Sequence, residues 1–142
     1  HERAGSKNIL HLHGEILKKR SELDPGLVCH ITNDMKLGEL SPDGSNWRPD
    51  IVWFEEPVPM MELAVPIALE ADIFVVVGTS LVVYPAAGLV HYTRPGIPVF
   101  VLDKKIPYFN NAGQVTSIEK PATEGIAELM DHLLAITDQA QG

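Results

Sequence analysis

The chain has 142 residues, enough for one domain with a hydrophobic core, and its 45% hydrophobic and 21% charged residues are typical of globular proteins. A net charge of −8 opposes non-specific binding to nucleic acid and favours a basic partner such as a lysine-rich peptide. The single cysteine, Cys29, excludes an intrachain disulfide and a four-cysteine zinc site and indicates a reducing, cytoplasmic setting. No apolar run approaches the roughly 18 residues of a membrane span, so we expect no membrane partner.

The first apolar segment ends in a histidine and a glycine. Residues 8–14 alternate loosely between apolar and polar side chains, which predicts a short strand or extended segment that delivers His13 to a turn. A histidine in an open turn titrates near neutral pH and can serve as a general base. A structural histidine is the alternative. His11 points to the same face of an extended segment, so only the following glycine favours His13.

The next part of the chain is rich in turn residues. Residues 15–20 predict a brief helix or strand, and residues 21–47 predict an irregular surface excursion or small subdomain. Cys29 and His30 lie there near Asp34, but a structural zinc site needs four ligands and this segment lacks a second ligand pair. We therefore predict no metal site.

Residues 48–54 predict a second buried strand, which two glutamates and two prolines end. Glu55 and Glu56 do not suggest a shared acid-base site, because neighbouring side chains of an extended chain point to opposite sides. Residues 60–70 predict an amphipathic helix that Pro66 would kink or shorten. Its packed side is expected to consist of Met61, Ala64, Ile67 and Ala68.

A run of mostly β-branched and aromatic residues, 72–77, predicts a strand buried on both faces, as in a parallel sheet. Gly78, Thr79 and Ser80 follow it. A glycine lets a ligand approach the backbone, and two hydroxyls with the amides of the turn can donate hydrogen bonds to phosphate or ribose oxygens. A polar turn without a ligand is the alternative, because short motifs often occur by chance.

The carboxyl-terminal part alternates strands and helices. Residues 84–90 predict a helix, residues 98–103 a third buried strand, residues 115–119 a weaker fourth strand, and residues 122–136 a last helix. Asp103 ends the third strand, where a ribose-binding acid lies in dinucleotide folds, although a strand-capping aspartate is equally consistent. The apolar face of the last helix is expected to consist of Ile126, Leu129, Met130, Leu133 and Leu134. This succession predicts an α/β fold with a parallel sheet built from βαβ units.

Four segments occur in one order along the chain: residues 12–14, 48–59, 78–87 and 122–125. Together they resemble the sirtuins, the NAD-dependent protein lysine deacylases, most specifically in the stretches RPDIVWF and GTSLVVYPAA. The resemblance implies a Rossmann-like, DHS-like NAD-binding fold that lacks its amino-terminal strand-loop unit. It also implies an enzyme that uses NAD, acts on an acyl-lysine protein or peptide, and releases nicotinamide and acyl-ADP-ribose.

The resemblance implies roles for individual residues. His13 matches the family's catalytic histidine and would remove a proton from the nicotinamide ribose, after the acyl-lysine oxygen has attacked the ribose carbon and nicotinamide has left. Residues 52–58 would pair with the substrate peptide as an added strand, through Val52, Trp53, Phe54, Glu55, Glu56 and Val58. The implied NAD-binding residues are Gly78, Thr79 and Ser80 at the ribose and phosphates, Asp103 where the family usually has an asparagine, and Ala122 and Thr123 at the adenine.

The chain departs from the family pattern in three places. It lacks the Gly-Ala-Gly phosphate loop and the Thr-Gln-Asn strand, so we expect residues 1–142 to be the carboxyl-terminal part of a catalytic domain that alone binds NAD poorly and does not turn over. It lacks two cysteine pairs, so we expect residues 21–47 to replace the family's zinc module without zinc. Glu55 stands where the family has a glycine, which predicts hindrance of a close peptide backbone or selection of basic flanking residues.

A second class of function is a non-catalytic nucleotide- or peptide-binding module, the product of a degenerate or split sirtuin gene. Upstream coding sequence in the same frame with the Gly-Ala-Gly loop would favour the enzyme, and its absence would favour the module. An exposed edge of the sheet is also expected to allow pairing with a second copy of the chain.

Overall fold

The structure is a computed structural model that describes residues 1–79, 81–106 and 115–140. The chain divides into two compact units, His1–Met60 and Met61–Gly142. The first unit includes the excursion predicted over residues 21–47 and also the histidine segment before it. The sequence did not indicate this division, because no change of composition marks it.

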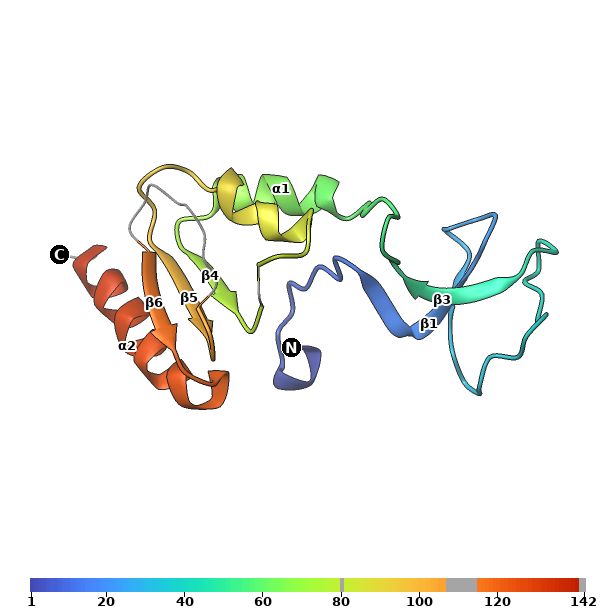
Figure 1. Ribbon diagram of the computed structural model, residues 1–142, viewed down its shortest axis with the longest axis horizontal. Helices are drawn as coiled ribbons and strands as arrows, with labels where there is room; N and C mark the ends of the chain where they lie inside the picture. Colours follow the sequence, from blue (N-terminus) through green and yellow to red (C-terminus); the bar gives the residue numbers. More distant parts are fainter. Residues whose placement is uncertain (80, 107–114, 141–142) are drawn as a thin grey trace. The chain divides into compact units, whose positions relative to one another are not determined.

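The first unit is built on an antiparallel sheet of three strands in the order β2-β1-β3 (Figure 1). Strand β1 (Gly14–Ser21) lies between β2 (Val28–His30) and β3 (Trp47–Ile51). A short 3₁₀ helix, η1 (Glu2–Ala4), precedes the sheet. The sheet therefore joins the histidine segment to the predicted substrate segment, because β1 begins where the first ends and β3 ends where the second begins.

Two expectations about these strands are corrected. Residues 8–13 form no strand, and the strand begins rather than ends at Gly14, although His13 does lie in the predicted turn, with Leu12. The buried strand predicted over residues 48–54 stops at Ile51 and is half-buried along its length.

A polar cluster ties the turns of the excursion together. Ser21 and Ser41 are only 1% and 5% exposed, and both hydroxyls donate hydrogen bonds to the carboxylate of Asp43. The Ser45 amide donates to the same carboxylate at 2.9 Å. The Ser21 hydroxyl also accepts two backbone amides at 3.0 Å. The cluster fastens the end of β1 to the turn that leads into β3.

Because of this cluster, we expect the stability of the first unit to fall at acidic pH. The hydroxyls of Ser21 and Ser41 hold the pKa of Asp43 well below its usual range. A carboxylate with a lowered folded-state pKa stabilises the fold above its unfolded-state pKa, and this contribution is lost as the pH falls through the folded-state value. We expect the free energy of unfolding to fall below about pH 4 and Asp43→Asn to remove part of that dependence.

Urea unfolding followed by tryptophan fluorescence measures this effect, because both tryptophans, Trp47 and Trp53, lie in the first unit. The matched control is Asp34→Asn, which neutralises an exposed carboxylate of the same excursion and should leave the pH dependence intact. Equal pH dependence in the two variants and the unmodified chain would contradict the role given to the cluster.

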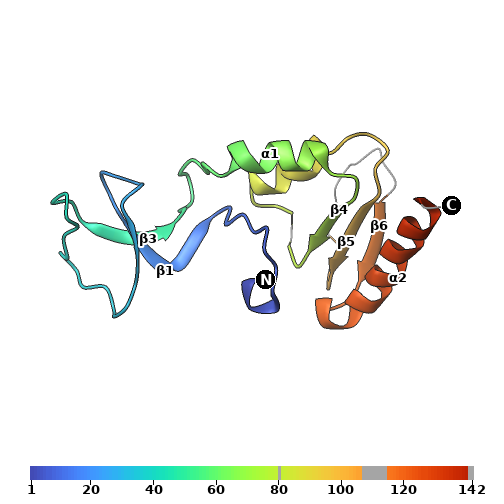
Figure 2. The same cartoon turned by 180° about the vertical axis from the view of Figure 1, so that it is seen from behind.

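The second unit contains a parallel sheet of three strands in the order β4-β5-β6, as the α/β prediction required (Figure 2). Helix α2 packs against β5 and β6, while α1 and the 3₁₀ helix η2 lie side by side. The elements are α1 (Met61–Glu70), β4 (Phe74–Val77), η2 (Ala86–Tyr92), β5 (Val99–Asp103), β6 (Val115–Glu119) and α2 (Ala122–Ala140).

The core of this unit lies between α2 and the sheet. Phe100, Leu102, Ile118 and Leu129 are at most 3% exposed and form one cluster. Gly125 allows α2 to approach, because a Cβ built there would lie 2.3 Å from a methyl carbon of Leu102. A glycine inside a helix is unfavourable by roughly 1 kcal/mol relative to alanine, and here close packing on the sheet offsets that cost.

The prediction that residues 72–77 form a strand buried on both faces is wrong. Val75 and Val77 are 38% and 46% exposed. They are the register partners of Phe100 and Leu102, so they face the same side as the helix-covered core. They stay accessible because β4 is the edge strand and α2 lies over β5 and β6.

The helices also differ in detail from their predictions. Helix α1 continues through Pro66, and Ile67 on its expected packed side is 62% exposed. The helix predicted over residues 84–90 is the 3₁₀ helix η2. In α2 the expected face is buried at Leu129, while Ile126, Met130 and Leu134 are 47%, 45% and 55% exposed. None of the helices in the described ranges has the length and hydrophobicity that a membrane crossing requires.

Candidate functional site

The turn that carries His13 is bonded to the start of the predicted substrate segment. The turn is closed by a hydrogen bond from the Gly14 amide to the His11 carbonyl oxygen, at 3.1 Å. The carbonyl oxygen of His13 accepts a hydrogen bond from the Val52 amide at 3.0 Å. The fold therefore brings together two predicted site residues that are far apart in the sequence.

Gly14 makes this close approach possible. Its φ is +82°, in the left-handed region that favours glycine, and a Cβ built there would lie 2.1 Å from the carbonyl oxygen of Asp50. In the ladder between β1 and β3, Gly14 is the register partner of Ile51. Any side chain at this position would push β3 away from the turn that carries His13.

The two histidines of this segment have different surroundings. His11 is half-buried, and its Nε2 lies 2.9 Å from Glu2 Oε1 and 3.8 Å from Glu15 Oε1. His13 is exposed, and its ring has no hydrogen-bond or ion-pair partner among the described residues. The ring of His13 is therefore accessible to a substrate, whereas that of His11 is engaged by carboxylates.

A hollow of about 350 Å³ lies beside this turn, within the first unit. Its wall combines apolar side chains from the segments before β1 and after β3 with four ionisable side chains. It is lined by Ile9, Leu10, His11, Leu12, Gly14, Glu15, Arg20, Asp50, Ile51, Val52, Pro59 and Met60. Val52 is the predicted site residue that lines this hollow.

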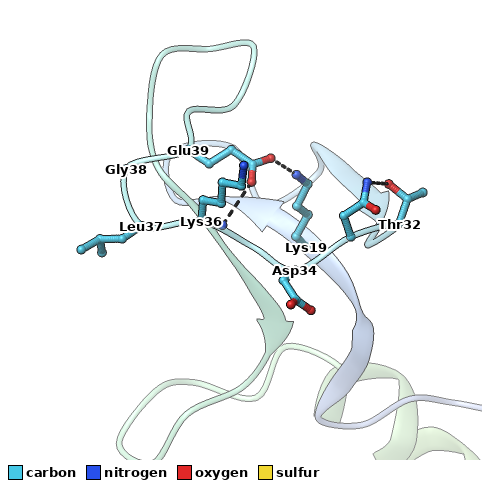
Figure 3. Close-up of a pocket in the computed structure, with 8 residues that line it drawn as sticks. Lys19, Thr32, Asp34, Lys36, Leu37, Gly38 and Glu39 are labelled. Carbon is cyan, nitrogen blue, oxygen red and sulfur yellow. Dashed lines mark hydrogen bonds and ion pairs between the residues drawn. The ribbon is translucent and has the colours of Figure 1, made fainter.

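A larger hollow of about 940 Å³ lies in the excursion and contains none of the predicted site residues (Figure 3). There Glu39 forms an ion pair with Lys19 and accepts the Lys36 amide at 3.4 Å. The Lys19 ammonium also lies 4.7 Å from the centroid of the Trp47 ring. The Lys19–Glu39 pair thus ties the excursion to β1, and Lys19 also contacts β3 through Trp47.

Glu56, at the end of the predicted substrate segment, is bound by Arg48. The Arg48 guanidinium donates to both carboxylate oxygens of Glu56, at 2.6 and 2.9 Å. The Trp53 amide donates to the same carboxylate at 3.0 Å, and the Glu56 amide donates to the Trp53 carbonyl oxygen at 3.2 Å. Sequence reasoning missed this pair because it compared Glu56 only with its neighbour Glu55, although Arg48 belongs to the same motif.

The ion pair with Arg48 gives Glu56 a lowered pKa that can be tested. The Arg48 guanidinium and the Trp53 amide lower the pKa of Glu56 to about 2, so the pair stabilises the fold above the ordinary glutamate range and less as the pH falls toward 2. We expect Arg48→Ala to raise the pKa of Glu56 toward about 4.3 in an NMR titration of the side-chain carboxyl. The control Arg94→Ala removes an arginine of the second unit that pairs with Asp72 and should leave the value low. A pKa of Glu56 that stays near 2 in Arg48→Ala would contradict the assignment.

The turn beyond Trp53 interrupts the predicted substrate segment. Phe54 and Glu55 form this turn, so residues 52–58 are not one continuous extended stretch. Glu55 has a φ of +71°, a conformation that favours glycine. Trp53 and Phe54 are 55% and 85% exposed. The segment thus presents two aromatic rings next to a glutamate in a strained conformation.

In the second unit the predicted NAD-binding residues follow the carboxyl ends of parallel strands. Gly78 and Thr79 follow β4, Asp103 ends β5, and Ala122 and Thr123 begin α2 after β6. The carboxyl ends of parallel strands meet at one edge of a sheet, and α/β sheets bind ligands there. The fold therefore brings these five residues to the edge that a nucleotide site requires.

The backbone at this edge has room for a ligand. Gly78 has a φ of +65°, and a Cβ built there would meet no atom within 4 Å. Its amide donates to the Leu102 carbonyl oxygen at 3.0 Å, which fixes the turn to β5. Thr79 is exposed, and Ser80 lies outside the described residues.

The contacts of Asp103 agree with both roles considered for it, a strand-capping aspartate and a ribose-binding acid. Its Oδ1 accepts the Lys105 amide at 3.1 Å, as a strand-capping aspartate does. The residue is half-buried at the sheet edge, as a ribose-binding acid is. The structure thus agrees with either role.

No cluster of three or more histidine, cysteine, aspartate or glutamate side chains suited to a metal ion occurs in the described part of the chain. Cys29 and His30 are consecutive residues of β2, opposite Lys19 and Lys18. Consecutive side chains of a strand point to opposite faces, so these two do not converge on one ion.

Comparison with known proteins identifies the family. The sequence model of the Sir2 family matches residues 1–85. The chain belongs to the Sir2 family. Among sirtuins of known structure, a Sir2 homologue variant in complex with ADP-ribose superposes with a TM-score of 0.81 at 29% identity, over 97% of this chain and 57% of that one. Sir2Tm bound to a propionylated peptide superposes with a TM-score of 0.71 at 26% identity, over 93% of this chain and 59% of that one.

Curated sirtuin relatives carry the name NAD-dependent protein deacylase. The Helicobacter pylori protein is 42% identical over 134 residues, covering 94% of this chain and 58% of the relative. The Bacteroides thetaiotaomicron protein is 44% identical over 140 residues, covering 94% and 60%. The Vibrio parahaemolyticus protein is 49% identical over 144 residues, covering 99% and 59%. The chain thus spans about three fifths of the length of these relatives, and the predicted sirtuin fold is confirmed.

Proposed function

We propose that the protein removes acyl groups from lysine side chains in an NAD-dependent reaction that releases nicotinamide and acyl-ADP-ribose. The observation that carries the proposal is the 3.0 Å hydrogen bond from the Val52 amide to the His13 carbonyl oxygen, which holds the candidate base beside the candidate substrate segment. The relatives named NAD-dependent protein deacylase support this class of reaction.

His13 is the general base of this proposal. NAD supplies the ribose carbon that accepts the acyl oxygen and the nicotinamide that leaves. The exposed ring of His13 has no partner among the described side chains, so it is available to remove a proton from a ribose hydroxyl. His11 supports the turn through Glu2 and Glu15 instead.

NAD is held by residues of the second unit in this proposal. The open space over Gly78 and its left-handed backbone fit the close approach of a phosphate or ribose. The proposed contacts are Gly78, Thr79, Ser80, Asp103, Ala122 and Thr123, of which Ser80 lies outside the described residues. Sirtuin structures in complex with NAD and with ADP-ribose support this assignment.

The acyl-lysine peptide binds along the segment that starts at Val52. Val52 borders the 350 Å³ hollow, and the exposed rings of Trp53 and Phe54 follow it. The proposed contacts are Val52, Trp53, Phe54, Glu55, Glu56 and Val58, with Glu56 acting through its bonds to Arg48 and the Trp53 amide. The neighbour bound to a propionylated peptide supports this type of substrate.

We also propose that the chain corresponds to the carboxyl-terminal part of a sirtuin catalytic domain. In it residues 21–47 occupy the place of the zinc module without zinc. The hydrogen-bonded cluster around Asp43 and the Lys19–Glu39 ion pair support an excursion held by protein contacts. The cytoplasmic location and the pairing of sheet edges between copies stay predictions.

The test is product analysis of the intact protein that contains this chain, with NAD and an acetyl-lysine peptide. We expect deacetylated peptide and acetyl-ADP-ribose in equal amounts by mass spectrometry, and neither when NAD is omitted. Peptide binding without either product would instead favour the non-catalytic module.

A further inference from the structure

Two adjacent glutamates of the substrate segment differ in what they can do. The carboxylate of Glu56 is taken up by the Arg48 guanidinium and the Trp53 amide. Glu55 is exposed, and no hydrogen bond or ion pair engages its carboxylate within the described ranges. Glu55 therefore presents an unpaired negative charge next to Phe54.

We propose that Glu55 is a specificity residue that selects acyl-lysine peptides carrying a lysine or arginine close to the acyl-lysine. The inference rests on the proposed function, because it requires that the peptide lies along the segment that starts at Val52. It goes further by naming the class of flanking residue that this chain favours.

The backbone conformation at Glu55 is one in which a side chain does not help the chain to fold. At a φ of +71° a residue with a Cβ is strained, and glycine would fit the same turn without strain. Strained backbone positions cluster at functional sites, where the observed outlier is the starting point for a functional hypothesis. The carboxylate also makes no contact that would stabilise the turn in the described part of the chain.

The charged side chains linked to Glu56 by ion pairs neutralise one another. Arg48 pairs with Glu56, and Arg20 lies 3.8 Å from Asp50 and 3.9 Å from Glu56. Two cations and two anions thus sum to zero. Glu55 adds a negative charge that no ion pair among the described residues neutralises. A cation near the acyl-lysine of an arriving peptide is therefore attracted, and an anion is repelled.

The two rings before Glu55 favour the same kind of flanking residue. Trp53 and Phe54 are 55% and 85% exposed, so their faces are open to contact. The aliphatic stem of a lysine or arginine can lie on an aromatic ring while its charged group reaches a nearby carboxylate. A neutral polar flank gains neither contact.

Fluorescence anisotropy of labelled acetyl-lysine peptides tests the proposal on the full chain. One peptide has lysine and arginine on both sides of the acetyl-lysine, and the other has glutamine in the same places. At low ionic strength we expect the cationic peptide to bind about two- to fivefold more tightly, the range expected for one exposed charge pair, and to lose this preference at high salt. The variants Glu55→Gln and Glu55→Gly should bring the ratio close to one, and glycine suits the backbone at this turn.

The matched control is Glu70→Gln, which removes the same charge from an exposed glutamate at the end of α1 and should keep the ratio. A ratio near one in the unmodified chain, or a ratio that survives both Glu55 variants, would overturn the inference and leave the proposed function standing. Failure of both acetyl-lysine peptides to bind more tightly than their unacetylated forms would overturn the proposed function and the inference with it.

Discussion

Replacing Gly14 with alanine is expected to destabilise the first unit by about 3 kcal/mol or more. A residue with a Cβ in the left-handed region costs about 1–2 kcal/mol. The new Cβ would also lie 2.1 Å from the Asp50 carbonyl oxygen, so β3 must move away and the hydrogen bond from Val52 to His13 must lengthen. Each backbone hydrogen bond lost adds about 1 kcal/mol. Urea unfolding followed by tryptophan fluorescence measures the change.

A matched control separates strain from overlap. Gly38 has a φ of +79°, and a Cβ built there would meet no atom within 4 Å. Gly38→Ala should therefore cost only the strain of about 1–2 kcal/mol. Equal losses in the two variants would show that the approach of Gly14 to Asp50 has no energetic importance.

Replacing His13 with alanine is expected to lower the rate of lysine deacylation about 10²- to 10⁴-fold, the usual contribution of a general base. The exposed ring is removed while the backbone bond from Val52 to the His13 carbonyl oxygen is kept, so peptide binding should change little. The formation of deacetylated peptide by the intact protein that contains this chain, at saturating NAD and peptide, measures the rate.

His11→Ala is the matched control for this variant. It removes the contacts with Glu2 and Glu15 but no group proposed to meet the substrate, so we expect a rate within about tenfold of the unmodified protein. A larger loss in His11→Ala than in His13→Ala would exchange the two roles, an alternative that the sequence alone left open.

The parallel half of the fold could be predicted from the sequence because its signals are local. The buried strand β5 reads as a continuous apolar run, and α2 has the spacing of an amphipathic helix. The antiparallel sheet could not be predicted in the same way. β1 carries three consecutive basic residues, Lys18 to Arg20, and β2 has only three residues, so neither shows a clear alternation.

Burial depends on which element covers a strand, and the sequence of the strand does not record it. Val75 and Val77 are β-branched residues typical of a central strand, yet they are accessible because β4 is an edge strand and α2 lies over β5 and β6. The candidate site follows the same rule. Its motif residues could be found from their order along the chain, whereas the pair of Arg48 and Glu56 forms only because the chain turns at Phe54.

Nicotinamide release from the intact protein that contains this chain, with NAD present and an acetyl-lysine peptide added or withheld, is the most direct test of lysine deacylation with His13 as the base. We expect nicotinamide to appear only with the peptide, in a one-to-one ratio with deacetylated peptide, and sustained release to be lost in His13→Ala. Nicotinamide release that does not require the peptide, or that continues at the same rate in His13→Ala, would contradict the assignment of His13 as the base of an NAD-dependent lysine deacylase.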